Sequence, residues 1–160
     1  MILKNLLMNL GIWSSIGIAL FSIFVVIVFR TRFVWKSRDK DGLLKKKQSL
    51  TGKLSSLILP VSFILLQIEF SYFSFDKNST ASYWSIFIIN YMLFAVLFTY
   101  DTLVIDYIVL SLWKPKFLKI PSTLNKDSMR KHILFSIPIG FLIGFILTLS
   151  SVSIFYYLLL

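Results

Sequence analysis

Long apolar runs and short polar segments alternate along this chain. A helix needs about 20 predominantly apolar residues to cross a hydrocarbon core of roughly 30 Å. Four runs meet that requirement and predict helices at about residues 8–29, 54–73, 83–112 and 133–157. We therefore expect an all-α fold, an integral membrane four-helix bundle that forms a single transmembrane domain over residues 1–160.

The overall composition supports this interpretation. The 160 residues are 57% hydrophobic, and their mean hydropathy is +0.81. A soluble domain of this size would carry far more polar surface. The segments 30–53 and 113–132, which separate the first helix from the second and the third from the fourth, are predicted to be loops.

Positive charge is concentrated in these two loops. Of 17 Lys and Arg, nine lie between Arg30 and Lys53 and six between Lys114 and Lys131. The positive-inside rule places such loops in the cytoplasm, which predicts a multi-pass plasma-membrane protein, bacterial in origin, with both termini outside. The rule also accounts for the net charge of +10, so no nucleic-acid partner is expected. The loops are an orientation signal, a contact for anionic lipid headgroups or a docking site for a cytoplasmic partner.

Tryptophan gives an independent depth scale, because its ring and N–H favour the membrane interface. The four tryptophans all fall near predicted helix ends: Trp13, Trp35, Trp84 and Trp113. Trp84 and Trp113 are 29 positions apart, about 44 Å of α-helix, close to the 40–45 Å of a bilayer with its headgroups. The third helix is therefore predicted to be one continuous span.

Two ridges of small residues predict close helix packing. Along the fourth predicted helix they are Ser136, Gly140, Gly144 and Thr148, and along the first they are Gly11, Ser15 and Ala19. In lipid, helices associate through close packing, and a GxxxG pair such as Gly140 and Gly144 lets backbones approach. We expect the first and fourth helices to pack through these ridges. The alternative is homodimerisation through the Gly140–Gly144 face.

Three ionisable side chains fall within predicted spans: Glu69, Asp101 and Asp106. A carboxylate at the middle of a membrane helix costs about 2.5–3.5 kcal/mol on insertion scales, so such groups default to a functional hypothesis. Asp101 and Asp106 are placed about 4 Å and 11 Å on the cytoplasmic side of the bilayer centre. At 100° per residue they point about 140° apart, which predicts different neighbours and no carboxylate pair.

Neutral polar residues accompany these acids. Asn90 is predicted to lie at the depth of Glu69 and to hydrogen-bond to it, and Thr99 and Thr102 are predicted to share a stripe with Asp106. Two interpretations stay open. The polar groups hold the helices in register, or the acidic residues line a proton or cation path.

The sequence offers little catalytic chemistry. It has no cysteine, and its single histidine, His132, lies among basic residues instead of convergent metal ligands. It has no G-x-S-x-G, P-loop or Rossmann glycine pattern. No catalytic residue, metal or cofactor is therefore predicted, and an intramembrane lipid-modifying enzyme ranks third among the functional interpretations.

One part of the chain resembles a known group. The segment Asp101–Tyr107, followed by Lys114-Pro115-Lys116-Phe117 and Ile120–Thr123, resembles a pattern in small multi-helix bacterial integral membrane proteins of unassigned function. That pattern is Asp-x4-Asp-aromatic, Pro-basic-Phe and Pro-Gly-Thr, with Ser122 in place of the glycine. The resemblance covers residues 98–144. It implies that the aspartates and the segment Lys114–Thr123 form one unit, and it implies no activity.

The sequence thus favours a non-enzymatic accessory or structural membrane protein, a subunit or partner of a larger membrane system or a homo-oligomer. The alternative is a small proton- or cation-coupled transporter or channel that uses the acidic residues.

Overall fold

The structure is a computed structural model that describes residues 2–30, 50–75, 81–118 and 126–159. This part of the chain is almost entirely helical, which confirms the all-α prediction. Its four main helices are α1 (Ile2–Arg30), α2 (Leu50–Ser74), α3 (Tyr83–Tyr100) and α4 (Lys126–Ile154). Each begins earlier than the apolar run that predicted it or at the same residue, because helical structure continues into the flanking polar positions.

Two of these helices continue as π-helix, in which each N–H bonds to the carbonyl five residues earlier. α3 passes into η2 (Asp101–Trp113), and α4 passes into η4 (Phe155–Leu159). A short 3₁₀ turn, η3 (Lys116–Leu118), follows η2. The predicted third span is therefore one continuous helical segment, but its second part, Asp101–Trp113, is wound differently from an α-helix.

Local chemistry explains where the third segment begins and ends. Ser82 has an extended backbone, and its hydroxyl accepts a bond from the Ser85 N–H at 3.3 Å, which caps α3. At the other end Lys114 has a φ of 48°, and its N–H donates to the Val109 carbonyl at 2.9 Å. A left-handed residue followed by Pro115 ends a helix, because the proline ring has no N–H with which to continue it.

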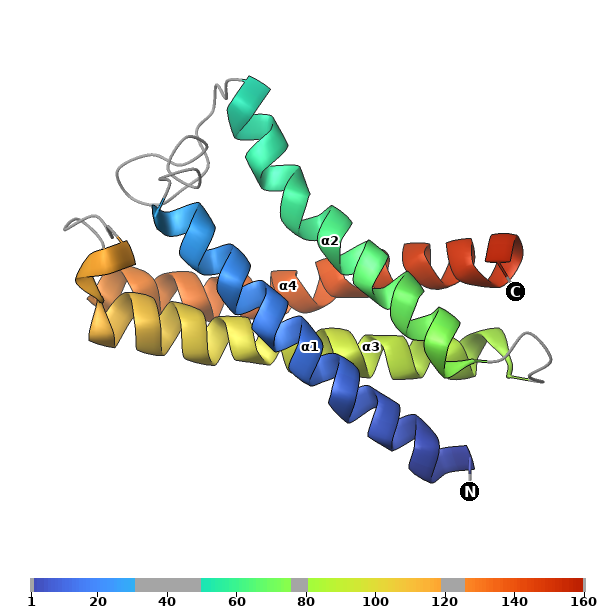
Figure 1. Cartoon of the computed structure of the whole chain (residues 1–160). Helices are drawn as coiled ribbons and strands as arrows, with labels where there is room; N and C mark the ends of the chain where they lie inside the picture. Colours follow the sequence, from blue (N-terminus) through green and yellow to red (C-terminus); the bar gives the residue numbers. More distant parts are fainter. Residues whose placement is uncertain (1, 31–49, 76–80, 119–125, 160) are drawn as a thin grey trace.

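The helices form two crossed pairs (Figure 1). α3 with η2 runs antiparallel to α4, and α1 and α2 lie across this pair. α2 contacts both α3 and α4, whereas α1 contacts α3, α2 and η3. The start of α1 and the end of η4 lie at the same end of the bundle (Figure 1).

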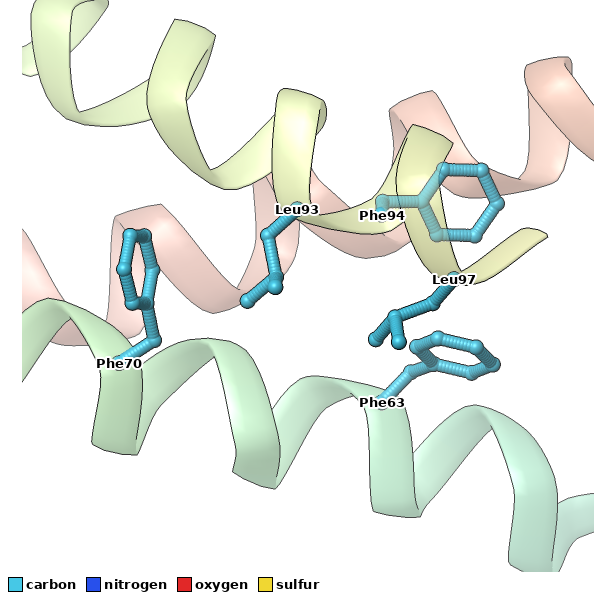
Figure 2. Packing of buried hydrophobic residues seen from close by; sticks show 5 residues of the cluster. All are labelled: Phe63, Phe70, Leu93, Phe94 and Leu97. Atoms are coloured by element: carbon cyan, nitrogen blue, oxygen red, sulfur yellow. The ribbon is translucent and has the colours of Figure 1, made fainter. Parts of the chain in front are cut away.

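The central apolar cluster joins α2 to α3. Its buried members are Phe63, Phe70, Leu93, Phe94 and Leu97. Figure 2 shows Phe63 and Phe70 of α2 directed toward α3, with Leu93 and Leu97 directed back toward α2. Phe63 and Phe70 are seven residues, or two helical turns, apart, and Leu93 and Leu97 are four apart, so each helix presents one face to the other.

Three helical stretches are long and apolar enough to cross a membrane: Asn5–Ile27, Tyr83–Trp113 and Ile133–Leu159. These three stretches are those among the described residues, and in α2 the side chains of 50–56 and 59 lie outside the described part of the chain. Trp84 and Trp113 are both largely exposed, one at each end of the second stretch. Trp13 is half-buried against Phe70, and Trp35 lies outside the described residues.

Candidate functional site

The main polar feature of the interior is a network of hydrogen bonds centred on Gln67. Its amide nitrogen, Nε2, donates to the backbone carbonyl of Asn90 at 3.1 Å and to Thr148 Oγ1 at 2.9 Å. Its amide oxygen, Oε1, accepts from Ser151 Oγ at 2.7 Å. One side chain of α2 therefore bonds to α3 and to α4 at the same level of the bundle.

Asn90 extends this network from α3. Its Nδ2 donates to Ser71 Oγ at 2.8 Å and to the Ile86 carbonyl at 2.9 Å. Ser71 in turn donates to the Gln67 carbonyl at 2.8 Å. We call Gln67, Ser71, Asn90, Thr148 and Ser151 the Gln67 network; every member is at most 1% exposed.

The Gln67 network is built from neutral side chains that are nearly all hydrogen-bonded. Asn90 Oδ1 is the exception, because it has no partner within the described residues. Hydrogen bonds between membrane helices contribute about 0.6 kcal/mol on average and up to about 1.7 kcal/mol each. The network therefore fixes the rotation and register of α2, α3 and α4, and it holds no group that titrates near neutral pH.

Glu69 lies on the opposite side of α2 from this network. Two residues along an α-helix point about 200° apart, so the burial of Gln67 turns Glu69 outward, where it is exposed. The predicted bond between Glu69 and Asn90 is therefore wrong: Asn90 is fully buried and donates to Ser71 and Ile86 instead. Within the described residues Glu69 has no hydrogen bond or ion pair.

Glu69 is surrounded on this surface by apolar side chains. Val61, Leu65 and Tyr72 are each more than half exposed. Together with Glu69 they form the series 61, 65, 69 and 72, in which successive positions are four, four and three residues apart. That spacing puts the four side chains on one helix face. We call Val61, Leu65, Glu69 and Tyr72 the α2 outer face.

Asp101 and Asp106 both lie in η2 and are half-buried, and neither is without a partner. The divergence of about 140° expected between them assumed an α-helix. In a π-helix, residues five apart are joined by the helical hydrogen bond and lie about one turn apart along the helix, so the angle of 140° does not apply to these two residues. Thr102 is buried and Thr99 is exposed, so they do not form one stripe.

The residues after η2 fold back onto the bundle. Pro115 is buried, and Leu118 joins an apolar cluster with Val25, Ile105 and Leu110. The described part of the segment 114–123 thus packs through Leu118 against Ile105 and Leu110 of η2 and Val25 of α1. Residues 119–123 lie outside the described part of the chain.

The Gly140–Gly144 ridge of α4 packs against α3 and not against α1. A Cβ on Gly140 would collide with the ring of Phe98, and one on Gly144 with the ring of Phe94. The rings of Tyr91, Phe94 and Phe98 stack along α3, with centroids 6.0 Å and 5.6 Å apart. The glycines are needed because these rings fill the space beside α4.

The small residues of α1 have a different environment from the one expected. Gly11, Ser15 and Ala19 are exposed, and nothing lies within 4 Å of a Cβ added to Gly11. α1 instead approaches α3 at Gly17, where an added Cβ would lie 2.9 Å from Leu97 Cδ2. Ser136 of α4 is half-buried and bonds to the Ile133 carbonyl of its own helix at 3.2 Å. The predicted packing of the first helix on the fourth through these ridges is wrong.

Three residues of the site were not singled out by the sequence: Ser71, Ser151 and Gly17. Thr148 was expected in the small-residue ridge of the fourth helix, and its bond to Gln67 was not predicted. Periodicity offered a usable signal, because Gln67 and Ser71 are four apart and Thr148 and Ser151 three apart, so each pair shares a helix face. The signal is weak, because Thr99 and Thr102 and also Ser150 and Ser153 are three residues apart without belonging to the Gln67 network.

The described residues contain no group of three or more His, Cys, Asp or Glu side chains placed to hold a metal ion. His132 has its side chain outside the described residues.

Comparison with known proteins adds no identity. No family model matches the chain, and neither a curated protein nor a solved structure is significantly similar to it. The fold and the site therefore define only a class: an all-helical protein with three described stretches able to span a membrane and a buried neutral network between its helices.

Proposed function

We propose that this chain is a non-enzymatic accessory subunit of a larger membrane system and that it binds its partner through the α2 outer face. The observation that carries this proposal is the exposed carboxyl of Glu69 within a stripe of exposed apolar side chains. Exposing an ionisable group to lipid costs free energy, so such a group is found where a partner pairs with it or water solvates it.

The depth of Glu69 is compatible with a basic side chain of a protein partner. Gln67 bonds at the level of Asn90, which is six residues, or about 9 Å, along α3 from the interfacial Trp84. Glu69 then lies near the outer boundary of the hydrocarbon core. An Arg, Lys or hydrogen-bond donor on a neighbouring transmembrane helix would pair with the carboxylate there, while Leu65 and Val61 pack against apolar residues of the same helix.

A second copy of this chain is a poorer fit to the same surface. In a two-fold symmetric dimer, both copies contribute the same surface to the interface, so the two α2 outer faces would meet. Two carboxylates would then face each other, and like charges in a low-dielectric setting repel. The charge of the face therefore favours a different, basic partner.

The proposed setting is the plasma membrane of a bacterial cell, with both termini outside and anionic lipid headgroups at the basic loops. Support comes from the segregation of Lys and Arg into two segments and from the location of the first and last helical residues at one end of the bundle (Figure 1).

Co-purification tests the docking proposal. The tagged full-length chain is extracted in mild detergent from cells that contain its natural partners, and Glu69→Lys is compared with Glu69→Gln. We expect Glu69→Lys to weaken recovery of the partner by at least roughly thirtyfold, as for an interface hot spot. Glu69→Gln retains a hydrogen-bonding group and should cause a smaller loss.

Two exposed leucines provide the matched control. Leu65 on the α2 outer face and Leu142 on α4 are 56% and 62% exposed. Leu65→Ala should reduce partner recovery and Leu142→Ala should not. Equal recovery of the partner with all four variants would contradict docking through α2. If only a second copy of this chain is recovered, the protein is a homo-oligomer and not an accessory subunit.

A second function, proton or cation transport, is favoured by one observation. Asp101 and Asp106 are half-buried in a π-helical segment, and π-helical turns occur frequently at functional sites. In proteoliposomes, transport predicts an ion flux that Asp101→Asn or Asp106→Asn abolishes while the protein remains folded. Absence of flux in the parent protein would remove this alternative.

A further inference from the structure

An apolar groove with a volume of about 200 Å³ lies between α1 and α2, and none of its lining residues belongs to the α2 outer face. Its walls include Gly17, Phe21 and Phe24 of α1 and Ser62 and Leu66 of α2, and its floor is Leu97 of α3. Gly17 matters because a larger side chain there would meet Leu97 and Leu66. Only glycine leaves the space between the two helices open at that point.

The lining selects an apolar occupant. Ser62 contributes the one hydroxyl of the walls, and its Oγ already donates to the Ile58 carbonyl of its own helix at 2.8 Å. A polar solute would therefore find no free donor among the lining side chains. An apolar cavity of about 150 Å³ holds a benzene-sized guest, so this groove has room for several carbons of a hydrocarbon chain.

The groove has a direction along the bundle. From Gly17 to Phe24 it follows α1 toward Arg30, and from Leu66 to Ser62 it follows α2 toward Leu50. Those seven residues of α1 span about 10 Å, most of one leaflet's half of a hydrocarbon core of roughly 30 Å. Both walls thus lead from mid-depth to the same end of the bundle.

Positive charge is present at that end. η3 contacts α1, and its Lys116 side chain is exposed. α1 itself ends at Arg30, where the most basic segment of the sequence begins. A basic residue near a membrane surface attracts anionic headgroups by about 1 kcal/mol.

We propose that the groove between α1 and α2 is a binding site for an anionic phospholipid of the inner leaflet. One acyl chain lies between Phe21, Phe24 and Leu66, and the phosphate lies at the end of the bundle that carries Lys116. The site is independent of the partner-binding role of Glu69, which is on another face of α2.

Native mass spectrometry of the full-length chain tests the site, with phosphatidylglycerol and phosphatidylcholine of identical acyl chains as probes. We expect phosphatidylglycerol to be retained more strongly, by about fivefold for each basic contact. Ser62→Phe, which fills the groove, should lower retention of both lipids. Leu65→Phe, an enlargement on the α2 outer face, should leave retention unchanged. Lys116→Glu should reduce the preference for the anionic lipid.

A second filling variant keeps the test decisive if Ser62→Phe disturbs the fold. Leu20→Trp enlarges an exposed side chain on the opposite wall, and helical content is checked by circular dichroism. The proposal is overturned if neither filling variant lowers retention or if both lipids bind equally to the parent protein. It is also overturned if Ser62→Phe abolishes only a dimer, since a second copy would then be the occupant.

Discussion

Ser150 and Ser151 are neighbours in sequence with opposite environments, and they show what one hydroxyl contributes inside this protein. Ser151 is 1% exposed and donates to Gln67 Oε1, whereas Ser150 is exposed and donates only to the Ile146 carbonyl of its own helix. Gln67 Oε1 is buried, so loss of its donor leaves an unpaired acceptor in the interior.

Ser151→Ala should therefore lower the free energy of unfolding by about 0.5–1.5 kcal/mol. Ser150→Ala should change the free energy of unfolding by less than about 0.5 kcal/mol, because the Ser150 hydroxyl bonds only to a carbonyl of its own helix. Reversible unfolding in mixed detergent and dodecyl sulfate measures both. Equal effects would show that the Gln67 network does not contribute to stability.

The sequence singled out Asn90 and Glu69 as polar residues but did not predict their true neighbours. Asn90 stood out because a polar amide in an apolar run is unusual, and Glu69 was its nearest acidic neighbour in predicted depth. Depth follows from counting residues, whereas pairing depends on helix rotation. A rotation of about 200° separates Gln67 from Glu69, and only packing decided which of the two turned inward.

At the scale of the helix, α4 depends on its glycines for close contact with α3. Gly144→Ala would place a Cβ within the volume of the Phe94 ring, and Phe94 is only 4% exposed. Forcing extra atoms into packed interiors costs typically about 1–3 kcal/mol. Gly144→Ala should lower the unfolding free energy by that amount.

Gly11→Ala is the matched control on α1, where an added Cβ meets nothing within 4 Å. Because alanine favours helix over glycine by about 1 kcal/mol, Gly11→Ala should leave the protein equally stable or more stable. Thermal unfolding in detergent distinguishes the two variants. A destabilised Gly11→Ala together with a neutral Gly144→Ala would contradict the packing of α4 on α3.

The four helices could be predicted because apolar runs of about 20 residues are a strong signal. Their contacts could not, since a small-residue ridge shows that a helix packs closely without showing against what. The π-helical winding of η2 was also unpredictable, because nothing in Asp101–Trp113 distinguishes it locally from an α-helix.

For the whole molecule, the location of both chain ends at one end of the bundle has a testable consequence for topology (Figure 1). The sequence has no cysteine, so single cysteines introduce unique labels. Leu159→Cys should react with a membrane-impermeant maleimide in intact cells, and Lys116→Cys only after permeabilisation, because basic segments face the cytoplasm. The opposite labelling pattern would invert the proposed orientation.

Site-specific photocrosslinking in native membranes tests most directly whether the α2 outer face binds another membrane protein. A photoreactive amino acid at Leu65 lies on the α2 outer face beside Glu69, and the same amino acid at Leu142 lies on an equally exposed part of α4. We predict that position 65 crosslinks to a transmembrane segment carrying Arg or Lys in another protein, and that Glu69→Lys removes this product while position 142 gives only lipid adducts. Lipid adducts alone at both positions would contradict an accessory role through α2.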